Sequence, residues 1–324
     1  MKAAIVTAPG QAPLYGDFSE PSASEGMEVI QVSASALSQF SKARASGSHY
    51  SSEGVFPAAA GVDGVGRTAD GRRVYFALPE TPYGALAEKS LVRAVQCVPV
   101  PDEVDDITAA AIANPGMSAW AALMERAHLQ PGETVLINGA TSTAGRIAVQ
   151  LAKYLGAGRV IGTGRNEAEL KELLSLGADA VISFKLDAND PAGAKQYEKA
   201  LCEEFARGVD VVVDYLWGES ARTILAAIVK AVEDAHPVRF VHVGAAGGEP
   251  SIDLPGAALR SSAIQLMGSG LKSVPLDKLL AGVRNVFAAV VPANLQIATK
   301  VVPLSAIAEN WETPAKPRVV CTMG

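Results

Sequence analysis

The sequence is poor in the residues that build metal sites and disulfide frameworks. Its 324 residues include three cysteines and four histidines. The cysteines stand singly, at Cys97, Cys202 and Cys321, so the chain has no Cys-x-x-Cys pair, and the histidines do not have metal-ligand spacing either. We therefore expect neither a structural zinc site nor a set of disulfides. His242 falls in an apolar run and is predicted to be a satisfied core residue rather than a metal ligand.

Charge and long apolar runs are also scarce. Charged residues make up 19% of the chain, the formal net charge is −6, and no basic stripe is present, which argues against general nucleic-acid binding. Gly, Pro or a charge interrupts every apolar run before it reaches membrane-spanning length. Residues 1–6 predict a short strand rather than a signal peptide. We expect a cytoplasmic protein with no nucleic-acid or membrane partner and with room for two domains.

The first third of the chain consists of short strand-like segments separated by Gly and Pro. The clearest of them are residues 28–32, 72–77 and 91–95. This pattern predicts an antiparallel, barrel-like β region. After it we expect a helix over 105–112, a break at Asn114-Pro115-Gly116, and a second helix over 118–125.

From Thr134 onward, strands and helices alternate. The strand candidates are 135–138, 160–164, 180–184, 209–214, 239–244 and 264–268. They are apolar throughout, as strands buried on both faces of a sheet must be. With right-handed crossovers they predict an α/β fold with a doubly wound, six-stranded parallel sheet. A further helix is expected over 275–290.

Residues 135–157 carry the most informative local pattern. A short strand runs into a loop bracketed by Gly139 and Gly145, and a helix with one apolar stripe follows. Such a turn brings backbone amides and the positive end of a helix dipole to a pyrophosphate. Ser142 replaces the middle glycine of the G-x-G-x-x-G pattern, so an ordinary strand–loop–helix stays an alternative.

The next strand ends at Arg165-Asn166, where a NAD-binding unit usually carries a carboxylate for the ribose. A guanidinium at this position suits the 2′-phosphate of NADP. The alternative is that Arg165 is a solvated charge that opens the next helix.

Motifs along nearly the whole chain occur in the order found in one enzyme superfamily. They are Gly61-Val62-Asp63-Gly64-Val65-Gly66, Asp70-Gly71-Arg72-Arg73-Val74, Gly84-Ala85-Leu86-Ala87-Glu88, Asn114-Pro115-Gly116-Met117-Ser118-Ala119-Trp120, Pro131-Gly132-Glu133-Thr134-Val135-Leu136, Leu176-Gly177-Ala178-Asp179 and Val209-Asp210-Val211-Val212-Val213-Asp214. The chain thereby resembles the medium-chain dehydrogenase/reductase superfamily. The resemblance implies a GroES-like substrate lobe over 1–113, a Rossmann dinucleotide-binding domain over 114–272, and a return segment over 273–324.

The departures from the superfamily pattern concern zinc. Where zinc alcohol dehydrogenases carry a Cys and a Gly-His-Glu signature, this chain has Ser38 and Gly61-Val62-Asp63. Without a thiolate or an imidazole these positions would not hold a catalytic zinc. The chain therefore resembles the zinc-independent, quinone oxidoreductase-like branch.

That branch implies NADPH-dependent hydride transfer to a small-molecule electron acceptor, either a quinone or an activated double bond of an α,β-unsaturated carbonyl compound. It also implies a homodimer or homotetramer. An alcohol or carbonyl reductase of the same fold and a non-catalytic NADPH-binding sensor are the alternatives.

The resemblance also assigns candidate residues. Tyr50 is the first choice as hydrogen-bond or proton donor, with a packed loop aromatic as the alternative; His49 is the second candidate, and Ser38 could touch substrate or be filler. Leu86 is expected to form an apolar wall. Asp214 is predicted to be a structural cap.

The predicted cofactor contacts follow the strand ends and the helix start after the β region. They are Asn114, Ser118, Gly139, Ser142, Thr143, Ala144, Gly145, Arg165, Asn166, Lys185, Gly244, Ala245, Ala246, Met267, Gly268 and Ser269. Ser118 also fits a helix N-cap, and Lys185 a solvated strand end.

Overall fold

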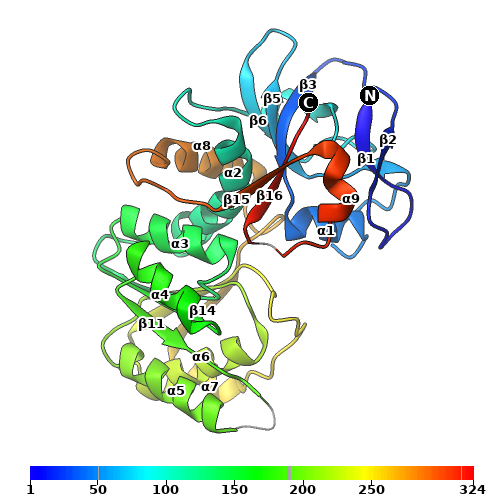
Figure 1. Cartoon of the computed structure of the whole chain (residues 1–324). Helices are drawn as coiled ribbons and strands as arrows, with labels where there is room; N and C mark the ends of the chain where they lie inside the picture. The colour runs from blue at the N-terminus through cyan, green and yellow to red at the C-terminus, as the bar shows by residue number, and fades with distance from the viewer. Residues whose placement is uncertain (50, 188–190, 315) are drawn as a thin grey trace. The chain divides into compact units, whose positions relative to one another are not determined.

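The computed structural model describes residues 1–49, 51–187, 191–314 and 316–324, and it divides the chain into two compact units (Figure 1). Unit 1 comprises Met1–Asn114, Val283–Pro292 and Ile297–Gly324, and unit 2 comprises Pro115–Gly282 and Ala293–Gln296. The chain passes between the units after residues 114, 282, 292 and 296, and the first two of these crossings lie inside the helices α2 (Asp106–Trp120) and α8 (Leu276–Ala289). The domain boundaries expected after residues 113 and 272 stay predictions.

Unit 1 is built from β-sheets. In its described residues, a three-stranded sheet has the order β2-β1-β4, and a seven-stranded sheet has the order β15-β16-β3-β5-β6-β8 with β7 also paired to β3. The strands are β1 (Lys2–Val6), β2 (Leu14–Asp17), β3 (Met27–Ala36), β4 (Ala58–Ala59), β5 (Asp63–Arg67), β6 (Arg73–Ala77), β7 (Lys89–Arg93), β8 (Cys97–Pro99), β15 (Thr299–Pro303) and β16 (Arg318–Thr322). Strands β15 and β16 are parallel, and the other pairs are antiparallel. The expected antiparallel β region is confirmed.

Short helical segments connect these strands. They are α1 (Gln39–Ala45), a 3-10 turn (Ala94–Gln96), a second 3-10 turn (Leu304–Ala306) and α9 (Ile307–Asn310).

The core of unit 1 follows the period-two alternation of its longest strand. Ile30, Val32 and Ala34 of β3 are buried, and the first two pack with Phe76 and Leu86 in one apolar cluster. The chain's last strand, β16 in red, runs beside the blue β3 and pairs with it (Figure 1). Residues 318–322 therefore complete the sheet that residues 27–36 begin.

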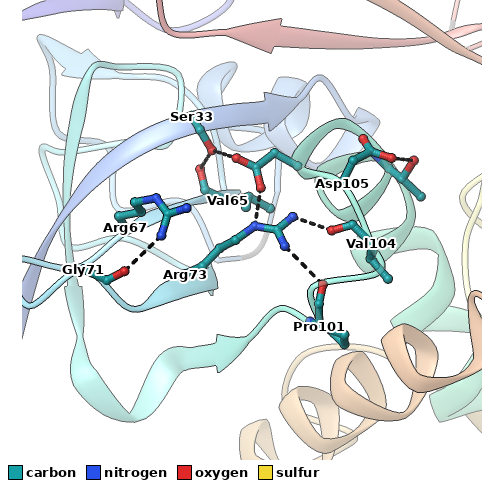
Figure 2. A network of polar contacts seen from close by, with 10 residues as sticks. Ser33, Val65, Arg67, Gly71, Arg73, Pro101, Val104 and Asp105 are labelled. Carbon is teal, nitrogen blue, oxygen red and sulfur yellow. Dashed lines mark hydrogen bonds and ion pairs between the residues drawn. The ribbon is translucent and has the colours of Figure 1, made fainter.

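A polar network anchors the start of α2 to this sheet (Figure 2). The Asp106 carboxylate accepts hydrogen bonds from the Ser33 hydroxyl at 2.5 Å and from Arg73 Nε at 2.6 Å. The same guanidinium donates to the carbonyl oxygens of Pro101 and Val104. Arg73 of β6 thus holds residues 101–106, and Asp106 links this stretch to Ser33 of β3.

Unit 2 contains a parallel sheet with the strand order β11-β10-β9-β12-β13-β14 in its described residues. The strands are β9 (Thr134–Asn138), β10 (Arg159–Gly164), β11 (Ala180–Ser183), β12 (Val211–Asp214), β13 (Pro237–His242) and β14 (Ala263–Gly268). The helices between them are α3 (Thr143–Tyr154), α4 (Glu167–Ser175), α5 (Pro191–Phe205), α6 (Gly218–Ala231) and α7 (Gly256–Arg260). All six predicted strands are present, with bounds within two residues of those expected. The doubly wound sheet and the GroES-like lobe are confirmed.

The apolar strands and helix faces of unit 2 are the parts of this unit that are removed from water. Val211, Val212 and Val213 of the central strand β12 have no exposed surface, because helices cover both faces of a doubly wound sheet. Helix α3 buries the apolar stripe of Ile147 and Leu151, and each such side chain contributes about 1.5–3 kcal/mol when fully removed from water.

The expected break at residues 114–116 is wrong. Helix α2 runs through Pro115 and continues as a π-helix over Ala121–Arg126. Residues 109–113 before the proline are fully buried, and this burial outweighs the roughly 3 kcal/mol that an interior proline costs. Ser118 is therefore an interior helix residue and not an N-cap.

None of the helices in the described residues is both long and apolar enough to cross a lipid bilayer.

A buried ionisable cluster lies in unit 1, at the start of β5. The Tyr75 hydroxyl donates to Asp63 Oδ2 at 3.0 Å, and Asp63 Oδ1 and the Arg318 atoms Nε and Nη2 are buried without a hydrogen-bond partner in the described part of the chain. Burial raises the pKa of Asp63 to about 6, although the Arg318 charge and the Tyr75 bond lower it. The pKa of Asp63 therefore depends mainly on its burial.

The Asp63→Asn variant should isolate this effect. An acid whose folded pKa is raised binds protons better in the folded state, so its contribution to stability falls as pH rises from 3.8, its ordinary pKa, to about 6. Relative to the wild type, the variant should gain up to about 3 kcal/mol of unfolding free energy across this window, measured by urea titration. Asp102→Asn, at an exposed position, is the control. A difference that does not change between pH 4 and 6.5 would contradict the assignment.

Candidate dinucleotide-binding site

The glycine-bracketed turn of unit 2 is held by close backbone packing. Strand β9 ends directly before Gly139, which has φ +82° and lies against the Leu216 side chain. The hydroxyl oxygen of Ser142, the N-cap of α3, accepts a hydrogen bond from Gly145 N–H at 3.0 Å. A Cβ on Gly145 would lie 2.4 Å from the Gly139 carbonyl oxygen. Only glycine at position 145 allows the helix start to approach the strand end this closely.

The start of α3 offers donors for an anion. Within the described residues, no hydrogen bond uses the backbone N–H of Ala144, which follows Thr143 in the first turn. Free amides at a helix N-terminus and the helix dipole both favour negative charge. This turn therefore fits a pyrophosphate, as the sequence predicts.

A cation follows the next strand. Arg165 is exposed, and no hydrogen bond or ion pair within the described ranges involves its guanidinium. The Asn166 Oδ1 atom caps α4 by accepting from the N–H groups of Ala168 and Glu169. Lys185 is exposed beyond the end of β11. The cationic part of the predicted 2′-phosphate site is thus available in Arg165, and the cap engages the Asn166 oxygen, which a phosphate would not use.

Arg146 is a second guanidinium near this end of the turn, and it is absent from the contacts predicted from the sequence. Its Nε donates to the Thr141 carbonyl oxygen at 3.3 Å, and its Nη2 donates to Glu172 at 2.6 Å. Thr141 lies beside Gly164, where a Cβ would be 2.8 Å from the threonine methyl. The sequence feature that could have indicated Arg146 is its position directly after Gly145, the last glycine of the motif.

The loops after β12 and β13 stay joined beyond the sheet. The N–H groups of Val243 and Gly244 both donate to the Asp214 carbonyl oxygen, and Ala246 N–H donates to the Tyr215 carbonyl oxygen at 3.0 Å. Ala245 is exposed beside them. These small residues leave the backbone accessible at the carboxyl edge of the sheet.

The remaining predicted cofactor contacts lie at the end of β14 and inside α2. Met267 and Gly268 end β14, and Ser269 N–H donates to the His242 carbonyl oxygen at 2.8 Å. Asn114 and Ser118 lie inside α2, where the Ser118 hydroxyl donates to the Pro115 carbonyl oxygen at 2.9 Å. The Ser118 hydroxyl therefore has a partner within its own helix.

One rung of the parallel sheet is polar across adjacent strands. Thr163, Asn138, Asp214 and His242 are register partners on β10, β9, β12 and β13, and we call them the polar rung. The Thr163 hydroxyl donates to Asn138 Oδ1 at 2.8 Å, and Asn138 Nδ2 donates to Asp214 Oδ1 at 2.8 Å. His242 Nδ1 lies 2.8 Å from Asp214 Oδ2. The rung lies at the carboxyl edge of the sheet, next to the loops that follow these strands.

Asp214 is the centre of this rung. Besides Asn138 and His242, it accepts hydrogen bonds from the N–H groups of Leu216 and Trp217, and it is fully buried. The prediction of a capping role is confirmed. His242 has a hydrogen-bond partner, as expected of a satisfied residue. The expectation that it lies in the core is wrong, because its side chain is 31% exposed.

Unit 1 holds the candidates for the acceptor side. The Ser38 hydroxyl is the N-cap of α1, accepting from Ser41 N–H at 2.9 Å. His49 Nδ1 accepts from Ser51 N–H at 3.1 Å, which places a ring hydrogen on Nε2. Burial, followed by the Arg44 charge, lowers the pKa of His49, so the imidazole is neutral. Leu86 is fully buried in the core of the unit.

Tyr50 lies outside the described residues, and its predicted role stays a prediction.

The positions that would bind a catalytic zinc carry unsuitable donors. Ser38 uses its hydroxyl in the cap, Val62 has no donor atom, and Asp63 is hydrogen-bonded to Tyr75. No group of three or more His, Cys, Asp and Glu side chains in the described residues could hold a metal ion. These residues do not fit zinc.

Comparison with known proteins places the similarity in both units. Residues 144–287 match the family model described as zinc-binding dehydrogenase. The chain is 27% identical over 276 residues to a probable NADPH-dependent quinone reductase of Emericella nidulans, which covers 75% of each chain. It is 31% identical over 202 residues to a 2-haloacrylate reductase of a Burkholderia species, which covers 57% of each.

Among solved structures, the quinone oxidoreductase of Thermus thermophilus, also determined in complex with NADPH, superposes over the whole of both chains. The TM-score is 0.78 and the sequence identity is 25%. The shared architecture therefore extends beyond the part that the family model matches.

The Gly145→Ala variant tests the packing of the turn. The added Cβ would meet backbone atoms that cannot rotate away, so we expect a loss of about 2–4 kcal/mol of unfolding free energy in urea titration. Gly256→Ala is the control, because its Cβ would have no neighbour closer than 3.7 Å at the start of another helix. Equal stability of the two variants would show that the turn can relax.

Proposed function

Because the chain belongs to the medium-chain dehydrogenase/reductase superfamily, in its quinone oxidoreductase-like group, we propose that it transfers hydride from NADPH to an electron-poor acceptor without a metal ion. The acceptor class is a quinone or a carbon–carbon double bond conjugated to a carbonyl group. The observation that carries the proposal is the packed turn from Gly139 to Gly145, with an unpaired amide at the start of α3 and an unpaired guanidinium at Arg165.

Cofactor binding follows from the donors of unit 2. The amide of Ala144 in the first turn of α3 would bind the pyrophosphate. Arg165 would bind the 2′-phosphate, with Lys185 as a further cation, and Arg146 adds positive charge at the same end. Bound NADPH supplies the hydride.

The acceptor needs little chemical help from the protein. Its own conjugated carbonyl makes one carbon electrophilic, so the residues have to position it, exclude water and stabilise negative charge on oxygen. In unit 1, we propose Tyr50 as the first choice of donor to such an oxygen and His49 as the second. Ser38 is left as a cap, because its hydroxyl already serves α1.

Support for a metal-free reaction comes from the donor set. Lewis-acid polarisation of an alcohol needs zinc bound by thiolate or imidazole, and Ser38, Val62 and Asp63 supply neither. A conjugated acceptor does not need this polarisation. The 2-haloacrylate reductase among the relatives acts, by its name, on a double bond conjugated to a carboxyl group.

We also propose a homodimer or homotetramer. Strand β14 ends the parallel sheet of the described residues, and it exposes Leu266 with 42% of its surface accessible. An exposed edge strand with an apolar side chain is a common site of association between chains.

Anaerobic NADPH oxidation tests the function. Purified protein should oxidise NADPH with 1,4-benzoquinone or 2-cyclohexen-1-one, and a chelator should leave the rate unchanged. Metal analysis of the same sample should find no stoichiometric zinc. Tight NADPH binding without turnover over a broad acceptor panel would favour a sensor, and zinc-dependent turnover would favour an alcohol or carbonyl reductase.

Arg165→Asp should change cofactor preference. Loss of charge-assisted bonds to a phosphate, together with repulsion, should lower kcat/KM for NADPH by roughly 10- to 100-fold and leave NADH use nearly unchanged. Arg260→Asp, at an exposed position in α7, is the control and should change neither value. An unchanged NADPH-to-NADH ratio in Arg165→Asp would remove this residue from the 2′-phosphate site.

A further inference from the structure

The polar rung is closed at one end and open at the other. Thr163, Asn138 and Asp214 are fully buried, whereas the His242 side chain is 31% exposed. The next register partner of His242 is Gly268 on β14. A Cβ on Gly268 would have no atom within 4 Å. The rung therefore ends in an imidazole with open space beside it.

Asp214 sets the protonation pattern of this imidazole. A carboxylate accepts hydrogen bonds, so the hydrogen between Asp214 Oδ2 and His242 Nδ1 belongs to the histidine. In the neutral ring, Nε2 then carries a lone pair and faces away from the carboxylate. No hydrogen bond within the described segments uses Nε2. The histidine thus offers one oriented acceptor at the carboxyl edge of the sheet.

Trp217 restricts the ring further. The centroids of the Trp217 and His242 rings lie 4.4 Å apart with an interplanar angle of 44°. Trp217 has φ +59°, a conformation that is costly for a bulky side chain, and its N–H is held by Asp214. One carboxylate therefore fixes both the imidazole and the indole that packs against it.

The position of His242 in the sheet indicates which half of a bound dinucleotide it would contact. Ligands of doubly wound sheets lie across the carboxyl ends of the strands at the switch point, here between β9 and β12. The turn after β9 and Arg165 after β10 are the sites that we propose for the pyrophosphate and the adenosine half. His242 ends β13 on the opposite side of the switch point, where the other half extends.

We propose that His242 is a cofactor-positioning residue whose Nε2 accepts a hydrogen bond from the nicotinamide riboside half of bound NADPH. The donors there are the ribose hydroxyls and the carboxamide N–H groups. Asp214 orients the acceptor, and the polar rung keeps Asp214 in place. This inference rests on the proposed function, because it requires NADPH as ligand.

The binding of two ligands distinguishes a direct contact between His242 and the cofactor from a general structural role of His242. His242→Phe keeps a ring against Trp217 and removes both nitrogens. The dissociation constant of NADPH, measured by calorimetry, should rise about three- to tenfold, as expected for one lost hydrogen bond. That of adenosine 2′,5′-bisphosphate, which lacks the nicotinamide half, should change less than twofold.

A second pair of variants separates the two ring nitrogens. His242→Gln carries its amide near the Nε2 position, and His242→Asn carries its amide near the Nδ1 position. A contact through Nε2 predicts that the Gln variant binds NADPH more tightly than the Asn variant. A purely structural role, in which the ring only serves Asp214, predicts the reverse order.

The chain offers a matched control at the other end of the same strand. His236 Nε2 lies 3.2 Å from Asp210 Oδ1, just before β13, with the same side-chain exposure of 31%. His236→Phe should leave both dissociation constants unchanged, because the amino edge of a parallel sheet does not meet the ligand.

The outcomes distinguish the two proposals. If the wild type does not bind NADPH saturably, the proposed function fails and the role of His242 fails with it. If the wild type binds NADPH and His242→Phe binds it equally well, the role of His242 alone is overturned. Equal weakening of NADPH and the bisphosphate would also overturn it, because the lost ring would then act through the fold.

Discussion

The buried carboxylate of Asp214 is the point on which the carboxyl edge of the parallel sheet depends. It lies on β12, at the switch point, and accepts hydrogen bonds from the two neighbouring strands through Asn138 and His242. It also accepts from the backbone of the loop that follows it. A buried carboxylate without such donors would be strongly destabilising. The same donors therefore satisfy the charge and fix the loop whose Leu216 lies against Gly139.

The glycines of the turn and the polar rung together determine the structure of the carboxyl edge of the parallel sheet. Gly145 lets the start of α3 approach the end of β9, while the rung holds β9, β12 and β13 in register at the same level. Backbone amides, an arginine and an oriented imidazole consequently lie along one edge of unit 2. Such an edge can orient a long, polar and flexible ligand at several points, which limits the number of conformations the ligand keeps when bound.

Local sequence patterns predicted the strands of unit 2 and the residues of the turn, whereas contacts between residues distant in the sequence could not be predicted from them. The six strands follow from apolar runs, and Gly139, Gly145 and Arg165 follow from spacing within about thirty residues. Asn138 and Asp214 are 76 positions apart, so their hydrogen bond has no local signature. Proline's local preference misplaced a helix break at Pro115, because burial of residues 109–113 decides that segment. Ser38 and Asn166 have capping roles that composition alone does not reveal.

The pairing of β16 with β3 has a consequence for the order in which the protein is made. Residues 318–322 complete a sheet begun by residues 27–36, whereas the parallel sheet of unit 2 is assembled from residues 134–268 alone. During synthesis from the amino terminus, the later-encoded unit can reach its native pairing while the earlier-encoded one still waits for its last strand. Its β3 edge stays unpaired over that interval, and unpaired edges recruit other chains.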